Sequence, residues 1–278
     1  MIERYEFKYL VDEKAVETIR RTVLSVGRRD PYAGPDGTYI IRSLYLDTHA
    51  NHLYLANERE ERDRFKARVR VYPGKAAPTF FEIKRRTGDV IRKSRGVVNG
   101  DWAPVARGDM NVACIPHTRP ALERFVEKTL RYHLEPKQLV QYEREAFAST
   151  IDSYARVTVD RRIVGQAMTR WSVEADERRW RPIDVGLLSY GMRESIAVLE
   201  LKFERRPPRW MVAMVKNLGL ERRSFSKYGK TVETQLQLPQ RREPLQDSDA
   251  FAPVLQEEPH AEAGPPEHRP RQPGVGYP

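Results

Sequence analysis

Pairs of opposite charge recur in this sequence at one short spacing, a glutamate followed two residues later by a lysine. The pairs are Glu6–Lys8, Glu82–Lys84 and Glu200–Lys202. Because side chains alternate between the two faces of a β-strand, both members of a pair project from the same face. Further charged rows at this spacing are Arg68–Arg70, Lys93–Arg95 and Arg156–Thr158–Asp160. The spacing therefore predicts several strands that each carry charge along one face.

The segment around Glu200 indicates where such a face points. The run Ala197–Phe203 is apolar except for Glu200 and Lys202, so we expect protein to cover both faces of this strand. An unpaired charge in a dry core costs several kcal/mol. A closed barrel with inward charges must therefore have a wet interior that holds a ligand.

The residue types in these rows indicate which ligand that is. Arginine and lysine outnumber the carboxylates, and guanidinium groups suit phosphate oxygens. The few carboxylates are hard oxygen donors of the kind that Mg²⁺ and Mn²⁺ prefer. This composition is typical of a phosphoryl-transfer site.

A simpler interpretation is that the charged faces are the solvent side of an open antiparallel sheet. Glutamate and lysine would then pair across strands and contribute a few tenths of a kcal/mol each. This interpretation suffices for any single strand. It is weaker for the set, because three such pairs on separate strands, one of them apolar on both sides, would have to arise by chance.

Strict alternation of apolar and polar residues predicts about nine strands that position these side chains. They cover residues 4–11, 39–46, 65–72, 79–86, 90–98, 139–147, 155–164, 167–171 and 195–203. Helical spacing follows the cap Asp12, follows Pro120 up to Leu130, begins again at Trp210, and covers the last turns to Leu238. The predicted fold class is α+β, a closed antiparallel β-barrel with peripheral helices.

The net charge of the chain resides in its first part. The 278 residues carry 49 Lys+Arg and 39 Asp+Glu, a formal charge of +10. Residues 238–278 form a Pro-rich, acidic tail without apolar periodicity, which we expect to be disordered. Residues 1–237 then form one folded domain with a charge of +13, which points to an anionic partner.

The remaining composition indicates a cellular setting. Cys114 is the single cysteine, so an intrachain disulfide is excluded. The first residues are charged and do not read as a secretory signal, which favours a reducing, cytoplasmic location. No segment approaches the roughly 18 to 20 apolar residues that a membrane-spanning helix needs.

The charged segments occur in an order that resembles a known family. They are Glu3–Tyr9, Ser43–Asp47, Lys66–Arg70, Phe81–Lys84, Lys93–Arg95, Tyr142–Arg144, Arg156–Asp160, Leu199–Lys202 and Ser226–Tyr228. As a set, over about residues 1–237, they resemble the catalytic domain of the vacuolar transporter chaperone (VTC) family. That family is the polyphosphate polymerase branch of the triphosphate tunnel metalloenzymes, also called CYTH-like, and this chain looks like a bacterial stand-alone member.

The resemblance implies an eight-stranded antiparallel tunnel, a divalent cation (Mn²⁺ or Mg²⁺), and transfer of the γ-phosphoryl group of ATP onto a growing polyphosphate chain. It implies catalytic roles for Arg68, Arg70, Lys84, Arg144, Arg156 and Lys227. It implies substrate-binding roles for Lys8, Lys93, Ser226, Tyr142 and Lys202. The metal ligand would be Glu200, with Glu6 and Glu82 as further candidates. The implied partners are ATP, inorganic polyphosphate or triphosphate, pyrophosphate and a separate membrane protein, at which the chain would be peripheral on the inner face of the membrane.

Two positions depart from the pattern of these relatives. The wider superfamily begins with a Glu-x-Glu-x-Lys strand, whereas Arg4 stands at the first position here. With fewer carboxylates to hold metals and activate water, an efficient hydrolase is less expected. The polymerase branch tends to carry a basic residue two positions before the Ser226–Lys227 pair, where this chain has Ser224.

Other functions remain open at this point. A tripolyphosphatase or nucleoside triphosphatase on the same fold would release orthophosphate, and a non-catalytic module would bind polyphosphate without turnover. Nucleic-acid binding is not expected, because it places stacking aromatics among the basic residues. Here Phe65, Phe81 and Phe203 alternate away from the charges.

Overall fold

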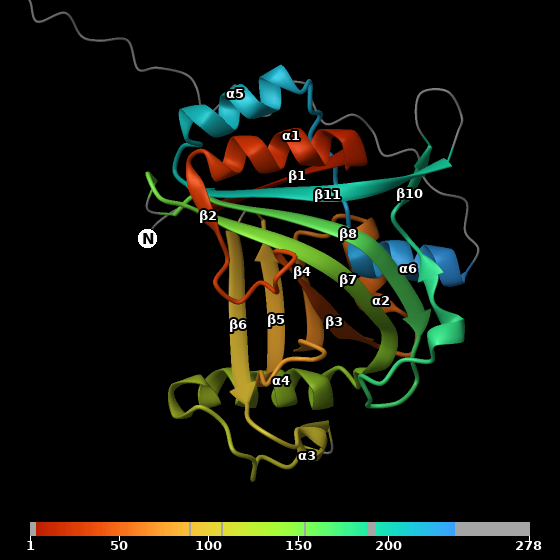
Figure 1. Ribbon diagram of the computed structural model, residues 1–278. Coiled ribbons are helices and arrows are strands. Elements are labelled where there is room, and N and C mark those ends of the chain that lie inside the picture. Colours follow the sequence, from red (N-terminus) through yellow and green to blue (C-terminus); the bar gives the residue numbers. More distant parts are fainter. Residues whose placement is uncertain (1–3, 89, 107, 153, 188–192, 237–278) are drawn as a thin grey trace, which may run out of the picture.

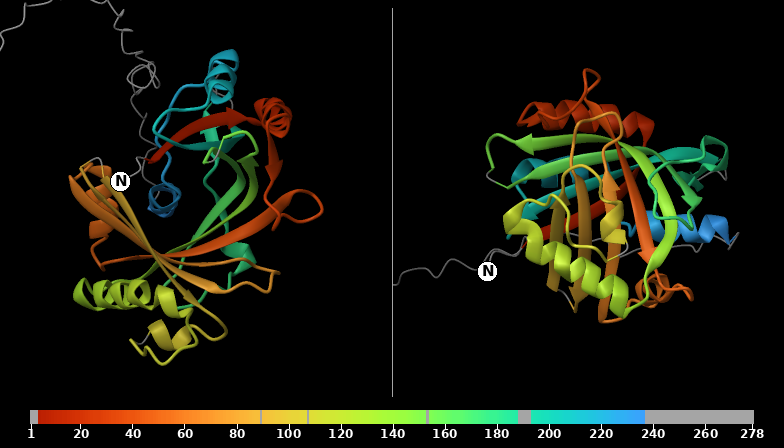
Figure 2. Two further views of the ribbon diagram at one scale, coloured as in Figure 1. Left: turned by 90° about the vertical axis from the view of Figure 1, so that its left-hand side faces the viewer. Right: turned by 90° about the horizontal axis from the view of Figure 1, so that it is seen from below.

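A computed structural model describes residues 4–88, 90–106, 108–152, 154–187 and 193–236. In this part of the chain a large antiparallel sheet curves round on itself, with helices α1, α4 and α5 on its outer side (Figures 1 and 2). The predicted α+β class with peripheral helices is confirmed. The tail predicted at residues 238–278 lies outside the described residues.

The main path of the sheet contains the eight strands that the resemblance implied, in the order β1-β11-β8-β7-β3-β4-β5-β6. Their bounds are β1 Arg4–Asp12, β3 Thr38–Asp47, β4 Asp63–Val71, β5 Thr79–Thr87, β6 Val90–Val98, β7 Glu135–Ser149, β8 Arg156–Ala167 and β11 Arg193–Glu204. Three short strands pair beside this path, β2 (Gly27–Arg29), β9 (Arg181–Pro182) and β10 (Val185–Leu187).

The expected closure of the barrel by backbone hydrogen bonds is wrong for the described residues. β1 and β6 end the path, and no ladder between them is found in this part of the chain. The returning chain before α6 meets the free edge of β1 instead. Tyr9 and Arg222 form an isolated antiparallel bridge, and the backbone N–H of Arg223 donates to the carbonyl of Lys8 at 2.9 Å. This segment occupies hydrogen-bonding groups of β1 that closure would require.

The expected strand at residues 167–171 is also wrong, because β8 ends at Ala167. Met168 is buried, and it and Trp171 join a hydrophobic cluster that includes residues of α4. Their apolar side chains therefore pack against that cluster, and the apolar spacing does not come from a strand.

Six α-helices occur in the described residues: α1 Glu13–Leu24, α2 His52–Glu58, α3 Ala103–Ala106, α4 Arg119–Arg131, α5 Arg209–Asn217 and α6 Lys227–Gln235. Short 3-10 turns span Pro116–Thr118 and Glu177–Arg179. The four predicted helices are confirmed as α1, α4, α5 and α6, whereas α2 and α3 were not predicted. None of the described helices combines the length and the apolar character needed to cross a membrane.

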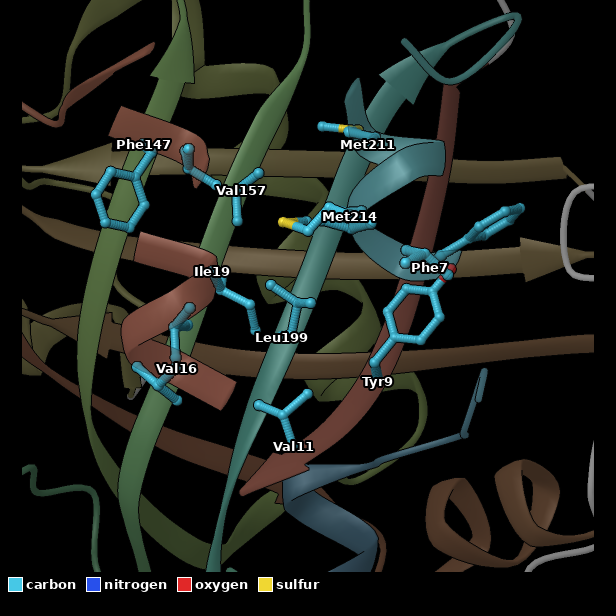
Figure 3. Packing of buried hydrophobic residues seen from close by; sticks show 14 of the residues in the cluster. Phe7, Tyr9, Val11, Val16, Ile19, Phe147, Val157, Leu199, Met211 and Met214 are labelled. Carbon is cyan, nitrogen blue, oxygen red and sulfur yellow. The ribbon is translucent and has the colours of Figure 1, made fainter. Parts of the chain in front are cut away.

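One hydrophobic cluster lies on the outer face of β1, β11 and β8, under α1 and α5 (Figure 3). The side chain of Asp12 caps α1 by accepting the N–H of Ala15 at 2.6 Å, as the sequence predicts. Helical spacing then buries Val16 and Ile19 against Leu199 of β11. The alternating strand residues thus meet a helix on this side of the sheet.

A second outer cluster forms where α4 crosses β3, β4, β5 and β6. Gly96 of β6 permits close packing, because a Cβ there would lie 2.8 Å from backbone and Cβ atoms of Leu122. Phe125 is buried as expected, but Leu130 is 61% exposed. Leu130 precedes the end of α4 at Arg131, so the last turn extends beyond the surface that the helix covers.

A third cluster lies on the inner face of the sheet, where α6 packs against β7 and β8. Tyr228 of α6 stacks on Tyr45 of β3 with ring centroids 5.3 Å apart. Its hydroxyl donates to the buried carboxylate of Asp47 at 2.7 Å, which also accepts backbone N–H groups of α2. These contacts fix the start of α6 inside the curve of the sheet.

Candidate functional site

The inner face of the sheet gathers charged side chains from β1, β4, β5, β6, β7, β8, β11 and the start of α6. We call this group the charged interior. It comprises ten cations, Lys8, Lys66, Arg68, Arg70, Lys84, Lys93, Arg95, Arg144, Lys202 and Lys227, and four carboxylates, Glu6, Glu82, Asp160 and Glu200.

Glu200 of β11 lies among four cations. Its carboxylate is 2.7 Å from Lys202 Nζ, and its distances to the nitrogens of Arg144, Lys8 and Lys227 are 3.7, 3.8 and 3.9 Å. Burial alone would raise the pKa of Glu200, but these positive charges hold it well below the ordinary value. Glu200 is therefore a buried anion, as the apolar run around it predicts.

A second buried anion, Asp160 of β8, positions two cations. Arg144 donates to both of its oxygens at 2.6 and 2.8 Å, and Lys227 Nζ lies 2.6 Å away. Burial disfavours the ionised form, yet the two cations lower the pKa of Asp160. This carboxylate holds the guanidinium of Arg144 and the ammonium of Lys227 side by side.

Glu82 of β5 gathers three arginines. Arg68 and Arg95 each lie within 2.8 Å of its oxygens, and Arg70 Nε is 3.5 Å away. That Nε atom is buried and has no hydrogen-bond partner among the described residues. Because a buried N–H without a hydrogen-bond partner costs free energy, this part of Arg70 is held in place at a cost in stability.

Glu6 joins the two ends of the sheet. From β1 its carboxylate lies 3.3 Å from Lys84 Nζ of β5 and 3.8 Å from Lys93 Nζ of β6. Burial and the charge of Glu200 act to raise the pKa of Glu6, but nearby lysines, Lys84 first among them, lower it to about 2. We call this contact of Glu6, Lys84 and Lys93 the seam, because here side chains join the two end strands, between which the described residues form no ladder.

Two lysines hold the chain at the start of α6. Lys8 Nζ donates to the carbonyl of Phe225 at 2.9 Å, and Lys66 Nζ donates to Ser226 Oγ at 2.9 Å. Ser226 also caps α6 by accepting the N–H of Gly229 at 3.0 Å. Burial, together with the charges of Lys8 and Lys84, lowers the pKa of Lys66 to about 7. Lys66 therefore exchanges a proton near neutral pH.

Two tyrosines also line the charged interior. Tyr45 Oη accepts a hydrogen bond from Arg68 at 2.9 Å, and the ring of Tyr142 faces Lys227 Nζ at 4.6 Å. The three phenylalanines expected to point away from the charges are buried in the outer clusters. The rings of Tyr45 and Tyr142 thus contact cations of the site.

The structure brings together all but one of the residues that the sequence singled out. Arg156 is the exception, because it is exposed and its guanidinium lies over the ring of Tyr154, 5.9 Å from the centroid. Its Cα pairs with that of Lys202 across the ladder, which places it at the rim.

Four residues of the site were absent from the predicted set, namely Tyr45, Lys66, Arg95 and Asp160. Lys66, Arg95 and Asp160 lie at the two-residue spacing from Arg68, Lys93 and Thr158, whereas Tyr45 lies in the segment Ser43–Asp47, which carries no such row. That spacing is the signal that could have found the three charged residues. The spacing does not show which residue of another strand pairs with each charge.

The carboxylates allow one kind of metal site. The described residues contain no group of three or more His, Cys, Asp or Glu side chains placed to hold a metal ion. Mg²⁺ commonly uses one or two protein carboxylates and completes its shell with waters and substrate phosphates. Lys202 already binds Glu200 Oε2 at 2.7 Å, but Glu200 Oε1 lies 3.8 and 3.9 Å from Lys8 and Lys227. Through that oxygen Glu200, with its neighbour Glu6, fits this arrangement, whereas both oxygens of Glu82 accept from arginines at 2.8 Å.

Comparison with solved structures finds chains of low sequence identity. Similar solved structures include the PH1819 protein from Pyrococcus horikoshii OT3, with 10% identity, a TM-score of 0.43, and coverage of 84% of this chain and 99% of that chain. A putative adenylate cyclase from Bacillus halodurans shows 10% identity, a TM-score of 0.43, and coverage of 80% and 92%. One from Vibrio parahaemolyticus shows 11% identity, a TM-score of 0.43, and coverage of 82% and 97%.

No curated protein matches the sequence. Among family descriptions, the VTC domain matches residues 3–236, which is nearly the whole of the part that carries the charged interior. The resemblance seen in the short charged segments is thereby confirmed, and the chain belongs to the VTC domain family.

Proposed function

We propose that the charged interior is a tunnel that binds linear phosphate chains, and that the protein transfers the γ-phosphoryl group of ATP onto a growing polyphosphate. The observation that carries this proposal is the excess of cations over carboxylates in the charged interior, ten against four. So many cations in one partly buried space repel one another, and a polyanion relieves that repulsion.

The carboxylates support this proposal by their arrangement. Each lies between cations from different elements, as Glu82 does between Arg68, Arg70 and Arg95. In this way a carboxylate fixes guanidinium and ammonium groups in place before the substrate arrives. Pre-positioned charges stabilise a transition state without reorganising during the reaction.

Phosphoryl transfer requires mainly that donor and acceptor be held in line and that the charge on the equatorial oxygens be neutralised. Arg68, Arg70 and Lys84 line one side of the interior, and Arg144 and Lys227 line the other. We assign these five residues to the transferring group. Lys8, Lys93 and Lys202, with Tyr142 and Ser226, would bind the flanking phosphates, and Arg156 at the rim would contact the chain as it passes.

A divalent cation, Mn²⁺ or Mg²⁺, is part of the proposal, with Glu200 and Glu6 as the residues that would hold it. Such an ion withdraws charge from phosphate oxygens when it is bound. The terminal phosphate of the acceptor is already an anion near neutral pH, so a dedicated strong base is not required. Pyrophosphate or triphosphate would serve as the shortest acceptors.

One experiment separates this function from its alternatives. The protein is incubated with ATP and Mn²⁺, and the products are separated on a gel stained for polyphosphate while orthophosphate is measured in parallel. A ladder of polymer supports the polymerase. Orthophosphate without polymer would indicate a hydrolase, and unchanged ATP with retained polyphosphate binding would indicate a binding module.

A further inference from the structure

Ser226 is a hydroxyl nucleophile placed among amines in the charged interior. Its Oγ lies 2.9 Å from Lys66 Nζ. The residue before it is held by Lys8 through the carbonyl of Phe225, and the residue after it is Lys227, whose ammonium lies 2.6 Å from Asp160. The side chain of Ser226 is only partly buried, so a ligand in the interior can reach it.

The function proposed above does not use this pair of Ser226 and Lys66 for covalent chemistry. A serine hydroxyl is a weak nucleophile unless an adjacent base takes its proton. Lys66 is such a base, because it is in hydrogen-bond reach and titrates near neutral pH. The groups that face Lys66 are Lys8 of β1, Lys84 of β5, Arg64 of β4 and Glu58 of α2.

We propose that Ser226 is a phosphoryl acceptor, so that the protein phosphorylates itself at this hydroxyl from ATP with Lys66 taking the proton. The bond between the γ-phosphorus and the bridging oxygen of ATP breaks, and its electron pair leaves with ADP. A bond forms between Ser226 Oγ and the γ-phosphorus. The hydroxyl proton passes to the neutral amine of Lys66, which becomes an ammonium beside the new phosphate.

The product of this step is stabilised by its surroundings. Ser226 is the N-cap of α6, and a phosphate at the beginning of a helix interacts favourably with the helix dipole and with free backbone N–H groups. Lys66, Lys8 and Lys227 add three positive charges close by. A phosphoserine here would present its oxygens to the same interior in which polymer grows, and would serve as a covalent primer.

This inference rests on the proposed function, because it requires that ATP phosphates bind in the charged interior. The test incubates the full chain with ATP labelled at the γ-phosphate and Mn²⁺, quenches with acid, and measures both protein-bound label and free polymer. We expect label bound covalently to the chain and located by peptide mass spectrometry at Ser226. Ser226→Asn removes the hydroxyl but keeps a good helix cap, and it should abolish the label, whereas Ser226→Thr should retain it.

Two further variants make the outcome specific. Lys66→Arg keeps a positive charge and a donor but cannot accept a proton, so labelling should slow by about 100-fold. Ser224→Ala, on the same segment with an exposed side chain, should label as the wild type does.

A chain that makes polymer but carries no phosphate at Ser226, or carries it elsewhere, overturns this inference and leaves the proposed function intact. A chain that neither makes polymer nor gains label overturns both.

Discussion

On β11, Leu199, Leu201 and Phe203 lie in an outer hydrophobic cluster, whereas Glu200 and Lys202 between them lie in the charged interior. The same division holds on β5, where Phe81 and Ile83 pack under α4 and Glu82 and Lys84 point inward. Neighbouring residues of one strand thus belong to two environments. Side-chain alternation with a period of two thus places the apolar side chains that stabilise the fold on one face and the charged side chains on the other.

The two faces differ in what they contribute to stability. Burying an apolar side chain such as Phe203 stabilises the fold by about 1.5 to 3 kcal/mol. The inner face instead concentrates like charges, whose repulsion raises the free energy of the folded state. We expect substitutions on the outer face to unfold the chain, and substitutions on the inner face to remove function while leaving the fold in place.

The largest expected effect is on the outer face. Phe203 is buried, stacks on Tyr5 at 5.6 Å and meets Phe7 edge-on at 5.2 Å. Phe203→Ala should lower the free energy of unfolding by about 3 to 5 kcal/mol, measured by urea denaturation. Ile151→Ala, at a residue that is 67% exposed, is the control and should change it by less than about 0.5 kcal/mol. Equal losses in both variants would contradict the division of the faces.

On the inner face, Arg70→Ala and Lys84→Ala should each lower polymer synthesis by about 100- to 1,000-fold, since each removes a charge that we assign to the transferring group. Their urea midpoints should stay close to that of the wild type. Arg85→Ala is a matched control, because Arg85 follows Lys84 on β5 but points outward to Asp63. Normal synthesis by Lys84→Ala, or equal loss in Arg85→Ala, would refute the assignment.

A smaller effect on stability is expected at Lys66, and it measures the repulsion between cations in the charged interior. The pKa of Lys66 is lowered to about 7 by burial and by Lys8 and Lys84, so its charge destabilises the folded state most fully at and below pH 7. As pH rises from 7 towards 10.5, the folded protein loses this proton while the unfolded chain keeps it, and the folded state gains stability. Lys66→Met should therefore be more stable than the wild type at pH 7, and this gap should shrink by about 2 kcal/mol at pH 9.

Lys66→Arg completes that measurement, because arginine stays charged over the whole range. Relative to this variant, the wild type should gain stability as pH rises, by a similar amount. The measurement is urea denaturation at pH 7 and pH 9 without phosphate in the buffer. A gap between wild type and Lys66→Met that is constant with pH would show that Lys66 carries no such strain.

The smallest expected effect on stability is at the N-cap of α1, on the outer side of the sheet. Asp12 caps α1, and Asp12→Ala should cost about 1 kcal/mol of stability. Asp12→Asn, which can still accept the hydrogen bond, should restore most of it. Polymer synthesis per folded molecule should be the same in all three proteins. A change in synthesis would show that the N-cap of α1 affects activity in the charged interior.

Alternation predicted the eight strands of the main path and the side of each that carries charge, because both follow from the local geometry of the extended chain. It predicted Glu200 as a buried anion for the same reason, since the residues around it are apolar on both faces. Helix caps and apolar spacing likewise located α1 and α5 to within a residue or two. Alternation failed at residues 167–171, where apolar side chains pack without forming a strand.

The rest depends on contacts between distant segments. Nothing local to Asp160 shows that Arg144 and Lys227 will meet it from β7 and α6. The bridge between Tyr9 and Arg222 joins residues more than two hundred positions apart, and it replaces the closure that a simple count of strands suggested. The exposed position of Arg156 depends on where β8 begins, and segment boundaries are what periodicity fixes least well.

The seam determines how the interior can change size. In a fully closed barrel the number of strands and their stagger fix the diameter, and widening it requires breaking a ladder. Here Glu6 holds the two ends together through Lys84 and Lys93 at 3.3 and 3.8 Å. A sheet joined in this way can widen by exchanging ion partners while every backbone ladder stays intact. We therefore expect the width of the interior to depend on ionic strength and on the charge of any ligand inside it.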